Sequence, residues 1–349
     1  MGRTPPEPVD NVARTIAKIV NSEDDGESQM DQQLAPGVRI LKLSPAVTGF
    51  PAWSRNEDYA DGDEDLDRGH ADWLVPEGAT NQTPRILYCH GGGYEQYSPQ
   101  DVYRPTTTRL AKATGMPILA FDYRLAPEYR YPAQLEDAVQ AFEWIAQNGP
   151  DGPGAASAIF LAGDSAGGGL ALALAVELRD HPVEGAAVAG ISVVSPETDL
   201  TCSGESYTSR RWDGDGPARD PMFREEDPVE ESLEAIHNLI GEPGTEGAIE
   251  PTACRLSPLH SELHGLPTTQ IHVGDAEVML SDSTNFTEKA RRAGSPVECT
   301  VWPRMWHTFT QFTEGGGGDD AEPLEEALAA VRQQGEFLRG LAAKLGLPV

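Results

Sequence analysis

Apolar and polar positions alternate along the chain in a pattern that predicts short strands separated by longer amphipathic helices. From about residue 70, apolar runs of strand length recur between segments with helical spacing. Strands joined by helix-length segments are typical of a mostly parallel, doubly wound sheet with right-handed crossovers. The predicted strands are 38–43, 72–75, 85–89, 117–123, 158–163, 187–195, 268–273 and 297–302, and the predicted helices are 105–114, 132–147, 167–179, 229–240, 283–293 and 322–345.

One interval breaks this rhythm. Residues 201–262 contain no strand-like run, only a polar loop and one helical piece. An insertion after a late strand lies above the carboxyl ends of the strands, where open α/β sheets bind ligands. We therefore expect an N-terminal segment and linker over 1–60, with a short helix at 9–20, and one α/β domain over 61–349 with an insertion at about 201–262.

The charge of the chain excludes some classes of partner. Its 349 residues include 56 acidic and 26 basic side chains, which gives a formal net charge of −30. Such a field repels nucleic acid and anionic membranes and favours neutral or cationic ligands. There is no apolar window of about 18 residues, so no membrane span is expected. The first residues lack an apolar leader and the four cysteines are far apart, which predicts a cytoplasmic protein with free thiols and no zinc site. The oligomeric state stays open, with a homodimer as one candidate.

The stretch from Ile159 to Gly169 carries the first sign of chemistry. A strand-like run ends at Gly163, and Gly163-x-Ser165-x-Gly167 then leads into a helix rich in alanine and leucine. This is the pattern of a nucleophile elbow, in which a serine occupies a strained strand-to-helix turn. Its flanking glycines allow close packing, and the helix N-terminus offers N–H donors to an anion. A glycine-rich turn whose serine has no catalytic role would have the same sequence pattern. The assignment of a nucleophile therefore needs support from other motifs in the chain.

A second glycine-rich loop, His90-Gly-Gly-Gly93, follows a predicted strand. Triple glycine lets backbone N–H groups turn inward, and with the N–H of Ala166 they would form an oxyanion hole. The alternative is a phosphate-binding loop, but the spacing matches neither nucleotide-binding pattern.

A serine nucleophile needs a base and an acid, in the chain order serine, acid, histidine. His307 follows the last predicted strand among aromatic residues and is the candidate base. The acid should follow the preceding strand, where three carboxylates compete. Glu277 is preferred, Asp275 is its main rival, and Asp282 is interpreted as an N-cap of the next helix. His272 lies inside a predicted strand, where we expect it to be packed.

These motifs resemble the bacterial hormone-sensitive-lipase-like family of α/β-hydrolases. The resemblance rests on His90-Gly-Gly-Gly93, Gly163-Asp-Ser-Ala-Gly167 and the closing His307, and further matching residues are Phe121 to Glu128, Tyr131-Pro-Ala133, Asp137, Ser195-Pro196 and Thr198-Asp-Leu200. It covers roughly residues 70–345. One position departs from the family, which usually has aspartate where the register from Gly274 selects Glu277.

The resemblance implies an α/β-hydrolase fold with a helical cap made by the N-terminal segment and the insertion. It also implies a serine carboxylesterase, with Ser165 as nucleophile, His307 as base and Gly92, Gly93 and Ala166 as oxyanion donors. The substrates would be small, neutral esters with short- to medium-chain acyl or aryl groups, and no cofactor or metal would be needed. Four residues are candidates for the pocket wall, although any of them could simply be core: Tyr94, Trp212, Met222 and Phe223.

Two other functions exist among proteins of similar sequence. Plant hormone receptors on this fold lose the histidine, and some lyases exchange the serine for threonine. His307 and Ser165 argue against both.

Overall fold

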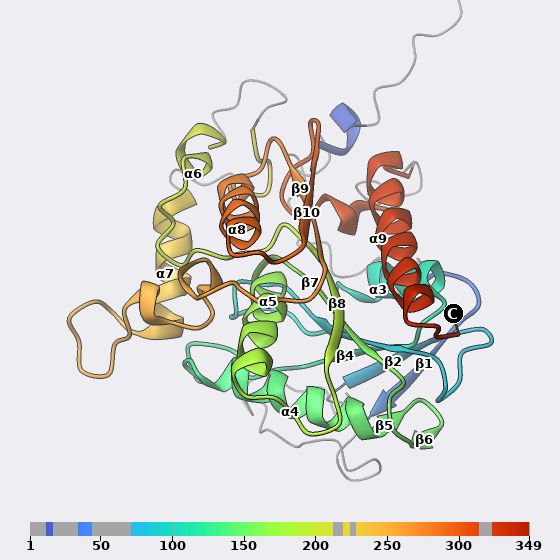
Figure 1. Ribbon diagram of the computed structural model, residues 1–349. Helices are drawn as coiled ribbons and strands as arrows, with labels where there is room; N and C mark the ends of the chain where they lie inside the picture. The colour runs from blue at the N-terminus through green and yellow to red at the C-terminus, as the bar shows by residue number, and fades with distance from the viewer. Residues whose placement is uncertain are drawn as a thin grey trace, which may run out of the picture.

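The computed structural model describes residues 12–16, 34–43, 71–100, 102–211, 219–223, 228–313 and 323–348. Within these residues an eight-stranded sheet has the order β1-β2-β4-β3-β7-β8-β9-β10 (Figure 1). β2 pairs antiparallel with β1 and with β4, and the other neighbouring strands are parallel. The strands are β1 (Val38–Leu43), β2 (Ala71–Pro76), β3 (Arg85–Cys89), β4 (Ile118–Phe121), β7 (Ile159–Asp164), β8 (Val188–Val194), β9 (Thr269–Gly274) and β10 (Val297–Trp302).

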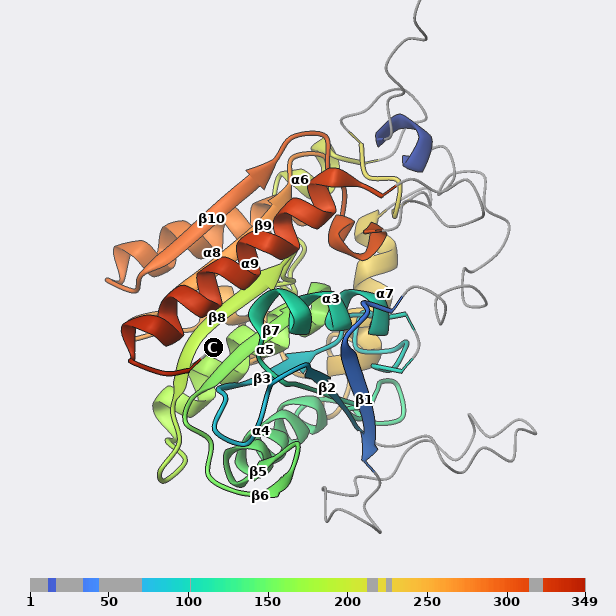
Figure 2. The same cartoon turned by 90° about the vertical axis from the view of Figure 1, so that its right-hand side faces the viewer.

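Helices cover both faces of this sheet (Figures 1 and 2). α3 and α9 pack against each other on one face, and α4, α5 and α8 lie on the other. The helices are α3 (Arg104–Thr114), α4 (Ala133–Gln147), α5 (Ser165–Asp180), α6 (Ser206–Ser209), α7 (Pro228–Ile240), α8 (Leu280–Arg292) and α9 (Glu325–Lys344); residues 12–16 are also helical.

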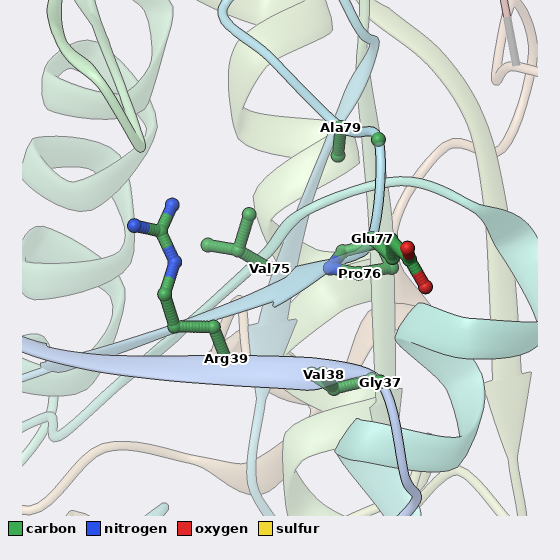
Figure 3. A pocket seen from close by; sticks show the side chains of 8 residues that line it. Gly37, Val38, Arg39, Val75, Pro76, Glu77 and Ala79 are labelled. Atoms are coloured by element: carbon green, nitrogen blue, oxygen red, sulfur yellow. The ribbon is translucent and has the colours of Figure 1, made fainter.

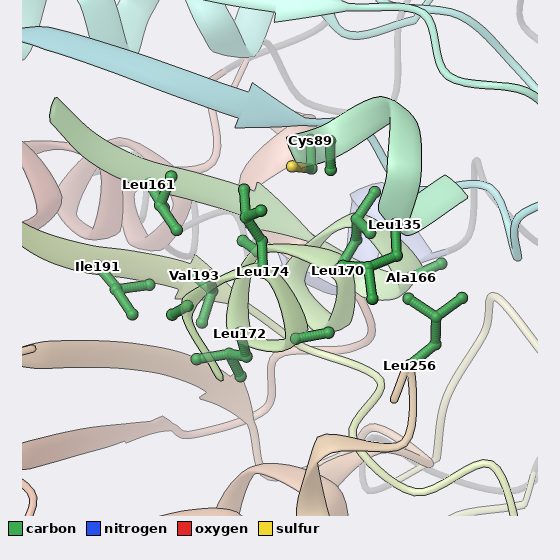
Figure 4. Close-up of a cluster of buried hydrophobic side chains, with 14 of the residues drawn as sticks. Cys89, Leu135, Leu161, Ala166, Leu170, Leu172, Leu174, Ile191, Val193 and Leu256 are labelled. Atoms are coloured by element: carbon green, nitrogen blue, oxygen red, sulfur yellow. The ribbon is translucent and has the colours of Figure 1, made fainter. Parts of the chain in front are cut away.

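The alternation of side chains along the central strands divides the core between these two faces. Leu87 and Leu161 belong to the cluster under α4 and α5, whereas Ile86 and Phe160 belong to the cluster under α3 and α9. This follows from the two-residue period of a strand. Figure 4 shows leucines of α5 packed against apolar side chains of β7 and β8. Because α5 is buried along most of its length, its first turn is held rigidly against the sheet.

The predicted elements are found within a few residues of their expected positions, and the mostly parallel sheet is confirmed. One detail was wrong. α8 begins at Leu280, so Asp282 lies in its first turn and is not its N-cap. The carboxylate of Asp282 instead accepts hydrogen bonds from the backbone N–H groups of Thr198 (2.7 Å) and Asp199 (2.8 Å). Asp282 therefore binds the backbone of a distant loop and does not cap the N-terminus of its own helix. The two-stranded hairpin of β5 (Asn148–Gly149) and β6 (Gly152–Pro153) was not predicted.

The predicted insertion contains α6, α7 and two short 3₁₀ helices, η3 (Pro251–Ala253) and η4 (Pro258–His260). Residues 212–218 and 224–227 lie outside the described residues, as does most of the segment 1–60. The proposed division of the chain into segment, domain and insertion therefore stays a prediction. No helix among the described residues is both long and apolar enough to cross a bilayer.

Candidate active site

Ser165 lies where β7 meets α5, in the left-handed backbone region with φ 53°. The glycines on either side are required by close approach. A Cβ on Gly163 would lie 2.6 Å from the carbonyl oxygen of Cys89, and one on Gly167 would lie 2.1 Å from that of His90. No side chain tolerates such distances, so the two glycines let the first turn of α5 contact the loop that follows β3. A non-glycine residue at positive φ is uncommon and marks a functional candidate.

The loop after β3 turns sharply at its glycines. Gly92 and Gly93 have φ values of 107° and 62°, and a Cβ on Gly92 would lie 2.2 Å from the carbonyl oxygen of Gln96. Asp164 holds this loop against the elbow. Its buried carboxylate accepts hydrogen bonds from the hydroxyl of Tyr88 (2.6 Å), the side-chain amide of Gln311 (2.8 Å) and the N–H of Gly91. The loop and the serine turn are thus held together by one buried side chain.

His307 is buried in the loop between β10 and the 3₁₀ helix η5 (Phe309–Phe312). Its Nε2 atom lies 2.9 Å from the Oγ atom of Ser165, although the two residues are 142 positions apart in the chain. The ring of Phe223 packs edge-on against the imidazole, with 5.4 Å between ring centroids. The structure therefore brings together the serine and the histidine that the sequence selected.

Of the three competing carboxylates, Glu277 lies beside the imidazole. Its Oε1 atom is 3.7 Å from the Nδ1 atom of His307, and its Oε2 atom accepts hydrogen bonds from the N–H of Gly274 and the hydroxyl of Ser195, both at 2.8 Å. The carboxylate of Asp275 accepts instead from the N–H of Arg304 at 2.6 Å. A separation of 3.7 Å is longer than a hydrogen bond, as is common for sites without substrate.

A fourth carboxylate, Asp220, was missed by the sequence reasoning. It is fully buried and comes from the insertion. It accepts hydrogen bonds from the N–H groups of Val278 (3.1 Å), Met222 (3.1 Å) and His307 (3.4 Å). In the sequence it stands in a polar loop beside proline, with no motif around it. Because the two partners that place it beside the imidazole, Val278 and His307, are distant in the chain, no local motif could have identified it.

Burial dominates the electrostatics of the site. It lowers the pKa of His307, and the negative charges of Asp220 and Asp164 oppose that change. Burial raises the pKa of Glu277, opposed by the Gly274 and Ser195 hydrogen bonds, and it raises the pKa of Asp164 to about 6. A neutral imidazole surrounded by carboxyl groups can accept a proton and then be stabilised as a cation.

Of the four predicted pocket residues, two lie where a ligand could contact them and one lies in the hydrophobic core. Phe223 lies on the imidazole and Met222 beside it is 39% exposed, so both can meet a ligand. Tyr94 is buried in the hydrophobic core at positive φ, and its ring is tilted against that of Tyr123. Trp212 lies outside the described residues.

A surface hollow of about 410 Å³ lies away from this site (Figure 3). It is lined by the start of β1 and the end of β2, including Arg39 and Glu77. In the register of β2 with β4, Ala71 pairs with Phe121 at the carboxyl end of β4, so Pro76 and the hollow lie at the opposite end of the sheet from Ser165. Among the described residues, no group of three or more His, Cys, Asp or Glu side chains is placed to hold a metal ion. The four cysteines are free.

The sequence profile of the α/β hydrolase fold matches residues 86–311, which include the serine turn and His307. The chain belongs to this α/β-hydrolase family. An acetyl-hydrolase of Streptomyces hygroscopicus is 36% identical to this α/β-hydrolase over 276 residues, which cover 78% of this chain and 80% of the relative.

Two solved structures extend the likeness over nearly the whole chain. An esterase from the bacterial hormone-sensitive lipase family has a TM-score of 0.71 and 28% identity, with 98% of this chain and 99% of that one covered. The crystal structure of EstE5 soaked with p-nitrophenyl butyrate superposes on this chain with a TM-score of 0.71 and 26% sequence identity. The match covers 96% of this chain and 100% of EstE5. The resemblance drawn from the motifs is thus confirmed, and this α/β-hydrolase is a carboxylic ester hydrolase.

Proposed function

We propose that this α/β-hydrolase cleaves esters through a Ser165–His307–Glu277 triad. The contact of 2.9 Å between Ser165 Oγ and His307 Nε2 carries this assignment. His307 takes the serine proton as Oγ attacks the ester carbonyl, and Glu277 stabilises the imidazolium that forms. The alcohol leaves with the proton from His307, and an acyl-enzyme remains. Water activated by the same histidine then releases the acid and restores the serine.

The oxyanion would be held by the N–H groups of Gly92, Gly93 and Ala166. Two observations support these donors. The positive φ values of both glycines turn the loop backbone in a way that side chains rarely allow, and Ala166 lies in the first turn of α5. Donors fixed before the reaction lower the barrier because they need no reorganisation when charge develops.

We propose small, neutral esters with short- to medium-chain acyl or aryl groups as substrates. The relatives support this class, since one is called an acetyl-hydrolase and another was soaked with a butyrate ester. The net charge of −30 repels anionic substrates. The insertion would act as the cap, with Met222 and Phe223 as pocket wall. Asn238 of α7 donates a hydrogen bond of 2.7 Å to Glu95, two residues after the glycine loop His90-Gly-Gly-Gly93, which supports a cap that contacts the site.

The test is the Ser165→Ala variant with p-nitrophenyl acetate, butyrate and octanoate. We expect kcat/KM to fall by about 10⁴-fold or more, because the nucleophile is lost. A fluorophosphonate probe should label the wild type at Ser165 and should not label the variant. Ser157→Ala is the matched control, since its exposed hydroxyl donates to the carbonyl of Gln82. Turnover retained in Ser165→Ala at more than about 1% of the wild type would refute the assignment.

A further inference from the structure

We propose that Asp220 is a positioning residue that orients His307 and ties the insertion to the triad. The proposal rests on the function proposed above, since it presupposes that His307 is the base. Asp220 is the one carboxylate near the imidazole that the triad does not use and that comes from the insertion, within the described residues. Its side chain is fully buried, and both of its oxygens accept hydrogen bonds.

The contacts of Asp220 join the two loops that carry the acid and the base. One oxygen, Oδ2, accepts from the N–H of Val278, the residue directly after Glu277. The other, Oδ1, accepts from the N–H of His307 itself. A single carboxylate therefore fixes the backbone of the acid loop relative to the backbone of the histidine loop. This matters because Glu277 and His307 are 3.7 Å apart, too far for their own hydrogen bond to set the ring orientation.

Asp220 also contributes charge. The charged groups that face His307 are Glu277, Asp220 and Asp164, and those that face Asp220 are His307 and Glu277. The negative charge of Asp220 favours the imidazolium form, which is the form created when the serine loses its proton. Burial raises the pKa of Asp220 and the imidazole opposes that change. The two groups thus support each other's charged forms during the reaction.

The same short segment carries part of the pocket wall. Met222 donates its N–H to Oδ1 of Asp220, and Phe223 packs on the His307 ring. A substrate that contacts Met222 or Phe223 therefore contacts the same short segment that holds the Asp220 carboxylate in place. The insertion would in this way both enclose the ester and set the base that cleaves it.

The experiment compares Asp220→Asn and Asp220→Ser with a matched control, Asp282→Asn. Asp282 is also buried and accepts two backbone N–H bonds, but neither comes from the triad loops. For each purified variant, kcat and KM for p-nitrophenyl butyrate are measured from about pH 5 to 9, together with Tm. We expect both Asp220 variants to lose kcat about tenfold or more, with KM changed less than about threefold. The acid limb of kcat/KM should move to lower pH by about 0.5 unit or more, because a negative charge next to the imidazole is gone.

The control should lower Tm and leave the acid limb in place. If the Asp220 variants lower Tm like Asp282→Asn but keep the acid limb and kcat of the wild type, Asp220 is merely structural and the proposal is wrong. Asp220→Ser gives the same readout if Asp220→Asn does not fold, since a smaller side chain avoids placing an amide against the Val278 N–H. Failure of the triad itself is recognised separately, as turnover that survives in Ser165→Ala.

Discussion

His272 lies in the middle of β9, where its ring is completely buried. Its Nδ1 atom accepts a hydrogen bond of 2.9 Å from the indole N–H of Trp302, and burial lowers its pKa from the ordinary 6.5 to about 4. Between about pH 6.5 and 4, His272 is protonated in the unfolded chain and neutral in the folded chain. The free energy of unfolding should therefore fall as the pH drops from about 6.5 towards 4, by up to about 3 kcal/mol from this residue alone.

The variant His272→Asn tests this prediction, because asparagine can accept a hydrogen bond without titrating. Urea unfolding at about pH 7.5 and about pH 4.5 gives the free energy of unfolding of each protein. We expect the variant to be less stable near neutral pH and to lose less stability on acidification than the wild type. His181→Asn is the control, since His181 is largely exposed. An equal loss for wild type and His272→Asn would mean that another group governs the acid sensitivity.

Residues that belong to a local sequence motif could be predicted, and those placed mainly by distant partners could not. Ser165 and the glycines around it stand within a few positions of one another, and His307 and Glu277 follow predicted strands in the order that the fold requires. Asp220 binds Val278 and His307, which are 58 and 87 positions away. Asp282 was misinterpreted for the same reason, because its partners lie 84 and 83 positions away, at Thr198 and Asp199.

At the level of elements, the sheet and its helices follow from the apolar pattern because the central strands β3, β4 and β7 are buried on both faces. Strands of parallel sheets read as continuous apolar runs, and β3, β4 and β7 do so. The ends of helices were less predictable. α5 begins at Ser165, two residues before the predicted start. Gly167 packs against the loop after β3, and Gly168 and Gly169 pack against Pro196 and Glu197 after β8, so a helix with three glycines is tolerated at that point. Propensity alone would delay the start of a helix whose first turns contain three glycines.

The close contact between Gly167 and the loop after β3 makes this glycine sensitive to substitution. In Gly167→Ala, the new Cβ would lie 2.1 Å from the carbonyl oxygen of His90, so α5 and the glycine loop must separate. We expect a loss of about 1–3 kcal/mol in the free energy of unfolding and a fall in kcat, since both sides of the proposed oxyanion hole shift. Gly340→Ala is the matched control, because Gly340 lies in α9 with open space where a Cβ would stand, and this variant should gain up to about 1 kcal/mol. Calorimetry and ester assays measure both effects. Unchanged kcat in Gly167→Ala would show that the loop adapts without cost.

At the scale of the whole molecule, the net charge of −30 sets how stability responds to salt. Like charges spread over one compact surface repel each other, and folding brings them closer together. Added salt shortens the screening length from about 30 Å at 0.01 M to about 10 Å at 0.1 M. We expect Tm near neutral pH to rise by at least about 3 °C between about 0.02 and 0.5 M NaCl, with most of the rise below about 0.2 M because the screening length changes most there.

Sucrose at matched osmolality is the control, since it acts by exclusion and not by screening. A flat Tm in NaCl, or an equal rise in sucrose, would show that short-range ion pairs such as Arg124–Asp137 already balance the repulsion.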